Sequence, residues 1–286
     1  MINLWYDTSY FSGRMGGPEK LVKNLQESLS DQNIPYTIND DSYEKNILIQ
    51  YDAIGHSKHE KLEHSSCFIG PQVWPFDPYG KFLLDNTKFY NKIIVPSKWV
   101  KDLMVNKFSC PADKIAIWAV GIEELYSDRN TTYDCLIYSK RRSSEELEQV
   151  KSFLTKHKLE YRMIEYGGYD ENEFRDLASQ ARFCFLLNGT ESQGIAVQEM
   201  MSLGVPLFVW DLRTWEDQGT EWSVPATSVP YWDDRCGERF YDIDDMQETF
   251  DNFYGRMDSY KPQNFVKDTL SYECSVKTLL EILNAD

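Results

Sequence analysis

The chain has 286 residues, enough for one large domain or two smaller ones. Hydrophobic residues make up 42% of it, so a substantial core can form and wholesale disorder is not expected. The formal net charge of −16 disfavours nucleic acid and anionic membrane surfaces as partners. Any anionic ligand must therefore be held by a local group of basic residues.

The six cysteines are scattered and form no C-x-x-C pair. This favours buried free thiols in a reducing compartment over disulfides or a zinc site. The N-terminus lacks the charged start and long apolar segment of a secretory signal, and no stretch approaches the roughly 20 apolar residues of a membrane span. We therefore expect a cytoplasmic protein without a transmembrane segment, while the sequence leaves the oligomeric state open.

Along the first half of the chain, short apolar runs alternate with amphipathic segments. A helix is expected after the glycine-containing loop 8–18, because Leu21, Leu25 and Leu29 recur at helical spacing. A second helix is expected at 98–108, with Ser97 at its cap position. The apolar runs predict strands at 2–7, 45–52, 66–70, 92–97 and 114–121.

The second half repeats this alternation. Ser143 or Ser144 stands at the cap position of one expected helix, and Gly204 ends another. The predicted strands are 133–139, 161–167, 182–188 and 205–211, and the predicted helices are 143–158, 171–181, 193–204 and 271–286.

Strands that alternate with helices predict parallel sheets with right-handed crossovers. Two such blocks meet near residues 121–130, so we expect two doubly wound domains. Ligands bind such sheets at the carboxyl ends of the strands, which makes a cleft between the two domains the default site.

Two carboxylates, Glu191 and Glu199, flank the expected start of helix 193–204. Glu199 lies about 9 Å beyond that start, at 1.5 Å per residue, and its side chain leans back toward it. Both acids can therefore address one ligand, and carboxylates accept hydrogen bonds from pairs of sugar hydroxyls. The alternative is that Glu191 only favours the helix start, by about 0.3–1 kcal/mol, and that Glu199 is a surface residue. The apolar neighbours of Glu199 disfavour this alternative.

A basic cluster, Ser139, Lys140, Arg141 and Arg142, follows strand 133–139. Arginine or lysine aimed at a departing diphosphate lowers the barrier to its release. A solvated charge run is the alternative, and the register among the three cations is open.

A glycine loop, 12–18, includes Gly16 and Gly17, whose backbone can approach a ligand closely. Its spacing does not match the G-x-G-x-x-G dinucleotide fingerprint. An ordinary flexible turn is the alternative, and Arg14 would add positive charge.

Three histidines, His56, His59 and His64, form a loose cluster after strand 45–52. A general base must reach the attacking hydroxyl, and His56 is closest to the strand end. Surface histidines are the alternative reading. Asp242 and Asp244, which flank Ile243, imitate a D-x-D metal motif, but we expect residues 242–244 to cap the helix that follows.

The segment around the two acids resembles the E-x7-E signature of retaining GT-B glycosyltransferases of the family 4 type. Its pattern is E-S-F-G-x-x-x-x-E-A-M-x-x-G-x-P, with Gln193 in place of Phe and Met200 in place of Ala. The segments 95–104, 115–126 and 235–253, and the Gly16–Gly17 loop, resemble further parts of that family in the same order. The matching residues of the signature are Glu191, Ser192, Gly194, Ile195, Glu199, Met201, Gly204 and Pro206.

The resemblance implies an α/β protein of GT-B type, in which two Rossmann-like doubly wound domains face a cleft. Residues 1–126 would form the acceptor-side domain, residues 127–260 the nucleotide-sugar-binding domain, and residues 261–286 a C-terminal helix that packs back on the first. The implied activity is retaining transfer of a sugar from a UDP- or GDP-sugar to a hydroxyl acceptor, without a bound metal or other cofactor.

The resemblance also implies roles for individual residues. Glu199 would bind the ribose hydroxyls and Glu191 a hydroxyl of the transferred sugar. The segment Ser192, Gln193, Gly194 and Ile195 would offer backbone N–H groups, and Lys140 with Arg141 or Arg142, next to Ser139, would bind the diphosphate. Gly16 and Gly17 would face the phosphates, and His56 would help orient the acceptor.

Two other functions stay open. One is a nucleotide-sugar epimerase or hydrolase on the same fold, and the other is a sugar-nucleotide-binding protein without catalysis.

Overall fold

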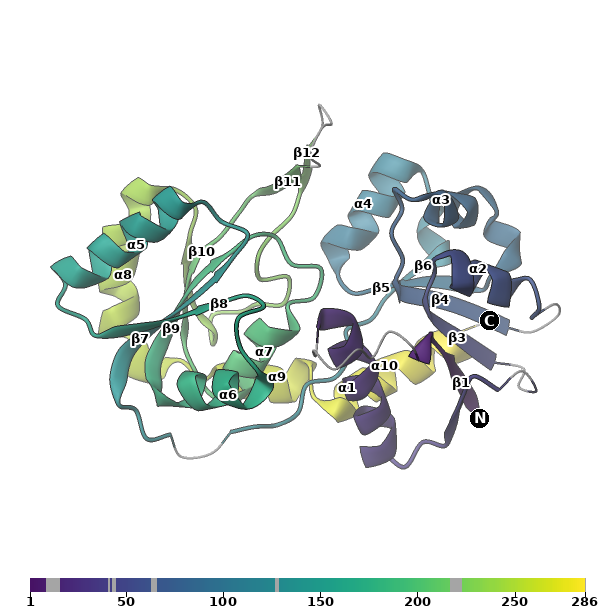
Figure 1. Ribbon diagram of the computed structural model, residues 1–286, viewed down its shortest axis with the longest axis horizontal. Helices are drawn as coiled ribbons and strands as arrows, with labels where there is room; N and C mark the ends of the chain where they lie inside the picture. Colours follow the sequence, from purple (N-terminus) through teal and green to yellow (C-terminus); the bar gives the residue numbers. More distant parts are fainter. Residues whose placement is uncertain are drawn as a thin grey trace. The chain divides into compact units, whose positions relative to one another are not determined.

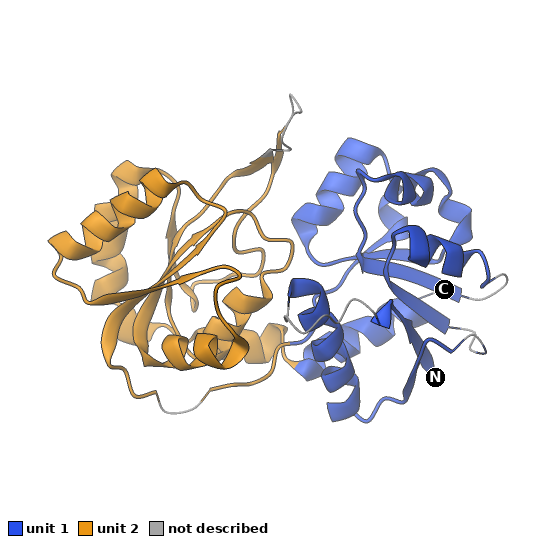
Figure 2. Ribbon diagram, viewed as in Figure 1, with its two compact units in different colours: residues 1–121, 272–286 blue, residues 122–271 orange. Residues whose placement is uncertain are grey.

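The structure, a computed structural model, describes residues 1–8, 16–40, 42, 45–62, 66–126, 129–216 and 223–285. The chain forms two compact units, shown in Figures 1 and 2. Unit 1 comprises residues 1–121 and 272–286, and unit 2 comprises residues 122–271.

Unit 1 contains a parallel sheet with the strand order β2-β1-β3-β4-β5-β6. Its strands are β1 (Ile2–Trp5), β2 (Tyr36–Ile38), β3 (Lys45–Gln50), β4 (Ser66–Gln72), β5 (Lys92–Val95) and β6 (Ile115–Ile117). Its helices are α1 (Gly17–Asp31), α2 (Ala53–His59), α3 (Pro78–Asp85), α4 (Lys98–Phe108) and α10 (Tyr272–Asn284).

The core of unit 1 follows from its apolar spacing. Leu25 and Leu29 of α1 are fully buried, as the helical period predicts. Helix α10 packs on α1, where the Tyr272 hydroxyl donates a hydrogen bond to Glu27 at 2.8 Å. The Trp118 indole N–H donates to the Ser275 carbonyl at 3.0 Å, which ties α10 to the segment that follows β6.

Unit 2 contains a second parallel sheet, with the order β13-β10-β9-β7-β8. Its strands are β7 (Tyr133–Lys140), β8 (Tyr161–Glu165), β9 (Ala181–Asn188), β10 (Leu207–Trp210) and β13 (Gly237–Phe240). Its helices are α5 (Ser144–Lys156), α6 (Glu171–Gln180), α7 (Ile195–Ser202), α8 (Met246–Gly255) and α9 (Pro262–Thr269). A short antiparallel hairpin joins β11 (Thr214–Glu216) and β12 (Ser223–Pro225).

Helices cover both faces of the sheet in unit 2 (Figure 1). On one face, Phe253 of α8 packs against Phe183 and Phe208, with ring centroids 5.4 and 5.3 Å away. On the other face, Phe174 of α6 packs edge-on against Tyr138 of β7, at 6.0 Å. Burial on both faces explains why these strands read as continuous apolar runs.

Both sheets share one topology. Numbered within each unit, the first strand lies between the second and the third, so the strand order reverses between β1 and β3 and again between β7 and β9. Ligands of doubly wound sheets bind beyond the carboxyl ends of the strands at this reversal. Lys140 is the last residue of β7, and Glu191 lies in the segment that follows β9. The segments that follow β1 and β3 contain Gly16 and His56.

Two of the predicted helix caps differ from the structure. Ser97 precedes α4 but accepts no capping hydrogen bond, and its hydroxyl is buried without a partner in the described part of the chain. Residues 242–244 do not cap α8 with a side chain, because a 3-10 turn, Ile243–Asp245, intervenes. The Ser143 prediction is confirmed, since Ser143 and Glu146 form a reciprocal capping box.

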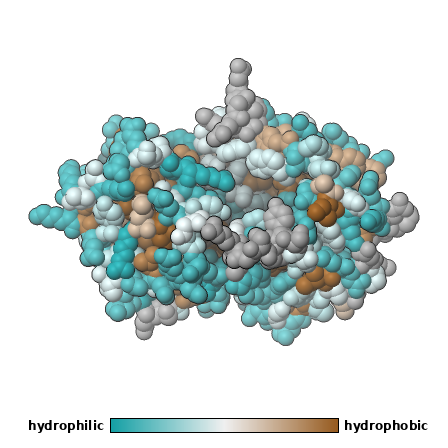
Figure 3. All heavy atoms as spheres, in the orientation of Figure 1, coloured by the Kyte–Doolittle hydropathy of each residue, from teal (hydrophilic) through white to brown (hydrophobic). Residues whose placement is uncertain are grey.

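The surface drawn in Figure 3 is mostly hydrophilic, with apolar side chains in small separate groups. All six cysteines are free thiols, and all except Cys274 are buried. None of the helices in the described ranges combines the length and hydropathy that a bilayer crossing requires.

A substitution of Gly237, at the start of β13, tests the close contact between β13 and β10. Its φ is +139°, and a Cβ there would lie 1.9 Å from the Leu207 carbonyl oxygen. We expect Gly237→Ala to lower the free energy of unfolding by about 1–3 kcal/mol or more, through backbone strain and overpacking. Gly255→Ala is the matched control, because a Cβ there meets nothing within 4 Å. Urea unfolding measures both variants, and equal stability of the two would contradict this account.

Candidate functional site

An ion pair joins the ends of the two central strands of unit 2. The Lys140 ammonium at the end of β7 lies 2.5 Å from Glu191 Oε1, in the loop after β9. The strand register places Lys140 opposite Asn188, whose amide donates to the same oxygen at 3.3 Å. The two charged side chains are 14% and 13% exposed, so both are largely withdrawn from water. Lys140 also lies over the Tyr166 ring, 4.3 Å from its centroid.

Glu199 lies on α7, which begins directly after this loop. The helix starts at Ile195, two residues later than predicted, because Gly194 takes a left-handed conformation with φ +82°. No side chain caps this helix start in the described structure, so its first N–H groups are oriented toward the loop. Glu199 is buried, with a side chain 7% exposed, and the Arg175 guanidinium donates to its Oε1 at 3.3 Å.

The Tyr169 hydroxyl lies in the electrostatic field of both acids. Burial raises the pKa of Tyr169, and the negative charges of Glu199 and Glu191 act in the same direction. The hydroxyl lies 2.8 Å from the Tyr138 hydroxyl, beneath the end of β7. Both carboxylates therefore act on the Tyr169 hydroxyl, while the binding of one ligand by both acids stays a prediction.

The loop 192–195 is held by two glutamines. Gln193 donates from its amide to the Gln198 side chain at 3.0 Å, and Gln198 donates back to the Gln193 carbonyl at 3.0 Å. Both side chains are buried, while Ser192 is exposed. The Gln193 side chain thus braces the loop from inside the protein.

The cations of the 139–142 cluster differ in their surroundings. Ser139 is paired within the sheet, and its carbonyl accepts from the Tyr166 N–H. Arg141 has φ +56°, and its exposed guanidinium makes no hydrogen bond or ion pair with any described residue.

Arg142 has a structural position. Its side chain is 4% exposed and donates to Glu146 and to the carbonyls of Asn188 and Trp210. These bonds tie the ends of β9 and β10 to α5, so the predicted diphosphate contact of Arg142 would compete with them.

Asp211, which sequence analysis missed, anchors the neighbouring loop. Its carboxylate is fully buried after β10 and accepts hydrogen bonds from Thr227 at 2.8 and 2.9 Å and from Ser228 at 2.8 Å. The Thr227 carbonyl in turn accepts from the Glu191 N–H at 3.0 Å. Asp211 thereby fixes the backbone that positions Glu191.

In unit 1, the predicted glycines stand at the start of α1. Gly16 is the residue before the helix, with an extended backbone, and Gly17 is its first residue. A Cβ at Gly17 would meet no atom of the described residues within 4 Å, whereas one at Gly16 would lie 2.8 Å from Glu19 Oε2. The preceding loop, including Arg14, lies outside the described residues.

Also in unit 1, the buried Tyr51 hydroxyl lies between His56 Nδ1, at 3.1 Å, and His59 Nδ1, at 2.9 Å. His59 Nε2 lies 2.8 Å from the Phe89 carbonyl, which only accepts, so a neutral His59 carries its proton on Nε2. Tyr51 then donates to His59 and accepts from His56 Nδ1–H. This order leaves the lone pair of a neutral His56 on Nε2. His64 lies outside the described residues.

Within the described ranges, no group of three or more histidine, cysteine or acidic side chains is arranged to hold a metal ion.

The sequence matches no protein-family model, and no curated protein is similar to it in sequence. Solved structures are similar in fold. A chain of the GtfA/B complex aligns at 12% identity with a TM-score of 0.60, over 92% of this chain and 60% of that one. A TarM variant from S. aureus, in complex with fondaparinux, alpha-GlcNAc-glycerol and UDP, aligns at 12% identity with a TM-score of 0.58, over 93% and 59%.

A glycosyltransferase from Rickettsia africae aligns at 11% identity with a TM-score of 0.58, over 100% of this chain and 99% of that one. This chain thus spans only about 60% of the first two proteins but the whole of the third. At such low identity the likeness shows the fold alone, and it confirms the predicted GT-B fold class.

Three residues of this site, Arg175, Tyr169 and Asp211, were absent from the sequence prediction. Tyr169 and Asp211 follow predicted strands, so the strand-end rule could have found them. Arg175 carries an i, i+4 partner, Glu171, which the sequence displays but which normally indicates only helix stabilisation.

Asp211→Asn tests the anchoring of the Glu191 loop. The amide cannot accept all the hydrogen bonds that the carboxylate accepts, so we expect the free energy of unfolding to fall by about 2–3 kcal/mol. Asp242→Asn is the control, because Asp242 is exposed and its ion pair with Arg213 is 3.7 Å long. Urea unfolding should separate the two variants, and a loss at Asp211 no larger than the control would refute the anchoring role.

His59→Gln tests the histidine chain through pH. Burial lowers the pKa of His59, so the unfolded state binds a proton more readily than the folded state. The contribution of neutral His59 to the free energy of unfolding is therefore fully present above about pH 6.5, and it is lost as the pH drops below that value. We expect the decrease in the free energy of unfolding between pH 7.5 and 5.5 to be smaller in His59→Gln than in the wild type. An identical decrease would count against a buried neutral His59.

Proposed function

We propose that this protein is a retaining glycosyltransferase of the family 4 type, which transfers a sugar from a UDP- or GDP-sugar to a hydroxyl acceptor without a metal ion. The observation that carries the proposal is the partly buried Lys140–Glu191 pair at the strand reversal, with Glu199 on the helix that starts there. Sequestered charges at this edge are costly for stability, which supports a role in binding.

The roles follow from the chemistry of each group. Glu199, an acceptor-only group, takes the two ribose hydroxyls, and Glu191 takes a hydroxyl of the transferred sugar. Lys140 and Arg141 bind the diphosphate, together with the first N–H groups of α7. Arg142 braces the strand ends, while the loop 192–194 presents backbone groups.

In the proposed reaction, the bond between the sugar C1 and the β-phosphate oxygen breaks, and the nucleoside diphosphate leaves with the bonding electrons. A bond forms between C1 and the acceptor oxygen on the same face of the sugar, and the acceptor proton passes to the departing phosphate. Lys140 stabilises the negative charge that grows on the leaving group. No enzyme nucleophile is assigned.

The acceptor side is assigned to unit 1. Tyr51 occupies His56 Nδ1, so His56 Nε2, which lies 3.7 Å from Glu60 Oε1, is the ring nitrogen that we assign to a contact with an acceptor hydroxyl. Gly16 and Gly17 at the start of α1 suit a close approach of phosphate. The UDP in the TarM structure supports a uridine nucleotide as the first donor to test.

Glu199→Ala and Lys140→Met test these roles. We expect Glu199→Ala to weaken binding of UDP or GDP by about 30-fold, equivalent to about 2 kcal/mol. We expect Lys140→Met to lower kcat by about 100–1,000-fold with a smaller effect on nucleotide binding. Calorimetry with UDP and GDP measures the first effect, and sugar transfer to a panel of hydroxyl acceptors measures the second.

Glu248→Ala, an exposed acid on α8, is the matched control and should bind and turn over normally. Unchanged binding and turnover in both site variants would refute the proposal. Sugar release that does not depend on an acceptor would indicate a hydrolase, and binding without turnover a sugar-nucleotide-binding protein.

A further inference from the structure

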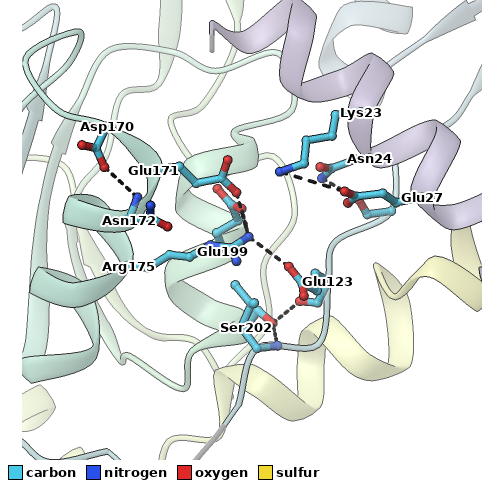
Figure 4. Close-up of polar contacts among 12 residues, drawn as sticks. Lys23, Asn24, Glu27, Glu123, Asp170, Glu171, Asn172, Arg175, Glu199 and Ser202 are labelled. Atoms are coloured by element: carbon cyan, nitrogen blue, oxygen red, sulfur yellow. Dashed lines mark hydrogen bonds and ion pairs between the residues drawn. The ribbon is translucent and has the colours of Figure 1, made fainter. Parts of the chain in front are cut away.

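Four charged side chains, one of them Glu199, form a cluster around the guanidinium of Arg175 (Figure 4). Arg175 of α6 places one guanidinium nitrogen, Nη2, 2.9 Å from Glu171, 3.0 Å from Glu123 and 3.3 Å from Glu199. Glu171 is on the same helix, Glu199 is on α7, and Glu123 is in the segment 122–126 at the N-terminal end of unit 2. One cation therefore connects three separate parts of the unit.

The three acids of this cluster share one guanidinium nitrogen of Arg175. A guanidinium nitrogen of this kind carries two N–H groups, and three carboxylates lie around it. The contact with Glu199 is the longest, so Glu199 can be released to a ligand while Arg175 keeps Glu171 and Glu123. Arg175 Nε is buried and has no hydrogen-bond partner in the described part of the chain, so the guanidinium has a donor to spare.

A second contact ties α7 to the same segment. The Ser202 hydroxyl, three residues after Glu199, donates to the Glu123 carbonyl at 2.5 Å and accepts from the Leu125 N–H at 2.9 Å. Ser202 therefore fixes the backbone of Glu123, and with it the position from which the Glu123 carboxylate reaches Arg175. Glu123 is therefore held through its side chain by Arg175 and through its backbone by Ser202.

We propose that Arg175 is a positioning residue for the ribose of the donor: it orients the Glu199 carboxylate and balances its charge until the ribose hydroxyls replace the guanidinium. Glu171 and Glu123 hold Arg175 in place during this exchange. The inference rests on the proposed function, because it takes Glu199 as the ribose ligand.

The charges explain why Arg175 is required. Without it, Glu199, Glu171 and Glu123 would lose the guanidinium that all three contact, and like charges repel. The nearly buried Glu199 would then turn away or take up a proton, and either change spoils its grip on a pair of hydroxyls. Lysine offers a single ammonium that cannot match the planar fork of arginine, so it replaces Arg175 only in part.

The test compares two nucleotides that differ only in the ribose hydroxyls. UDP and GDP are titrated into the full-length wild type, and the tighter of the two is compared with its 2′,3′-dideoxy analogue. We expect the wild type to prefer the natural nucleotide by about tenfold or more. Arg175→Met should reduce this preference toward one, and Arg175→Lys should give an intermediate value. A general structural defect would weaken both nucleotides equally and leave their ratio unchanged.

Arg182→Met is the matched control, because Arg182 is also an ion-paired arginine of unit 2 but pairs with Asp134 and Tyr254. It should keep the wild-type preference. Should Arg175→Met fail to fold, the nucleotide preference of Arg175→Lys serves as the test instead, because this variant keeps the positive charge that the three acids require. A wild-type preference retained in the Arg175 variant that folds overturns this inference alone. A wild type that binds neither UDP nor GDP overturns the proposed function, and this inference with it.

Discussion

The contact between Lys140 and Glu191 is the interaction on which the candidate site depends. It joins β7 to the loop after β9 at the point where the strand order reverses, and it holds two opposite charges with little access to water. Replacing such a pair with apolar residues often costs a protein no stability, because desolvation offsets the attraction. The proposed function explains the ion pair at this edge, because the donor would contact Lys140 and Glu191 in place of their contact with each other.

Other polar contacts serve to hold this pair in place. Asp211 fixes the segment that receives the Glu191 N–H, and Arg142 joins the ends of β9 and β10 to α5. Gly194 turns the chain so that α7 begins immediately after the loop. The rigid frame is therefore made by backbone geometry and buried hydrogen bonds, while Lys140, Glu191 and the exposed Arg141 remain at the strand edge.

The sequence predicted much of this arrangement, since apolar spacing indicated the strands and helices, and strand ends indicated Lys140 and Glu191. It could not rank Arg141 and Arg142, because a left-handed residue at Arg141 decides which side chain points inward. It placed the start of α7 too early, because the apolar spacing does not reveal that Gly194 has a left-handed backbone conformation. The partnership of Arg175 with Glu123 joins residues 52 positions apart, and no local pattern reveals such a contact. Which histidine nitrogen carries a proton likewise depends on the Phe89 carbonyl, which is 30 positions from His59.

A crystal structure of the full chain with UDP or GDP bound tests the central claim most directly. The account predicts that the ribose hydroxyls lie within hydrogen-bond distance of Glu199, and that the β-phosphate contacts Lys140 beside the start of α7. A nucleotide bound away from the carboxyl ends of β7 and β9, with Lys140 and Glu199 both out of its reach, would contradict it.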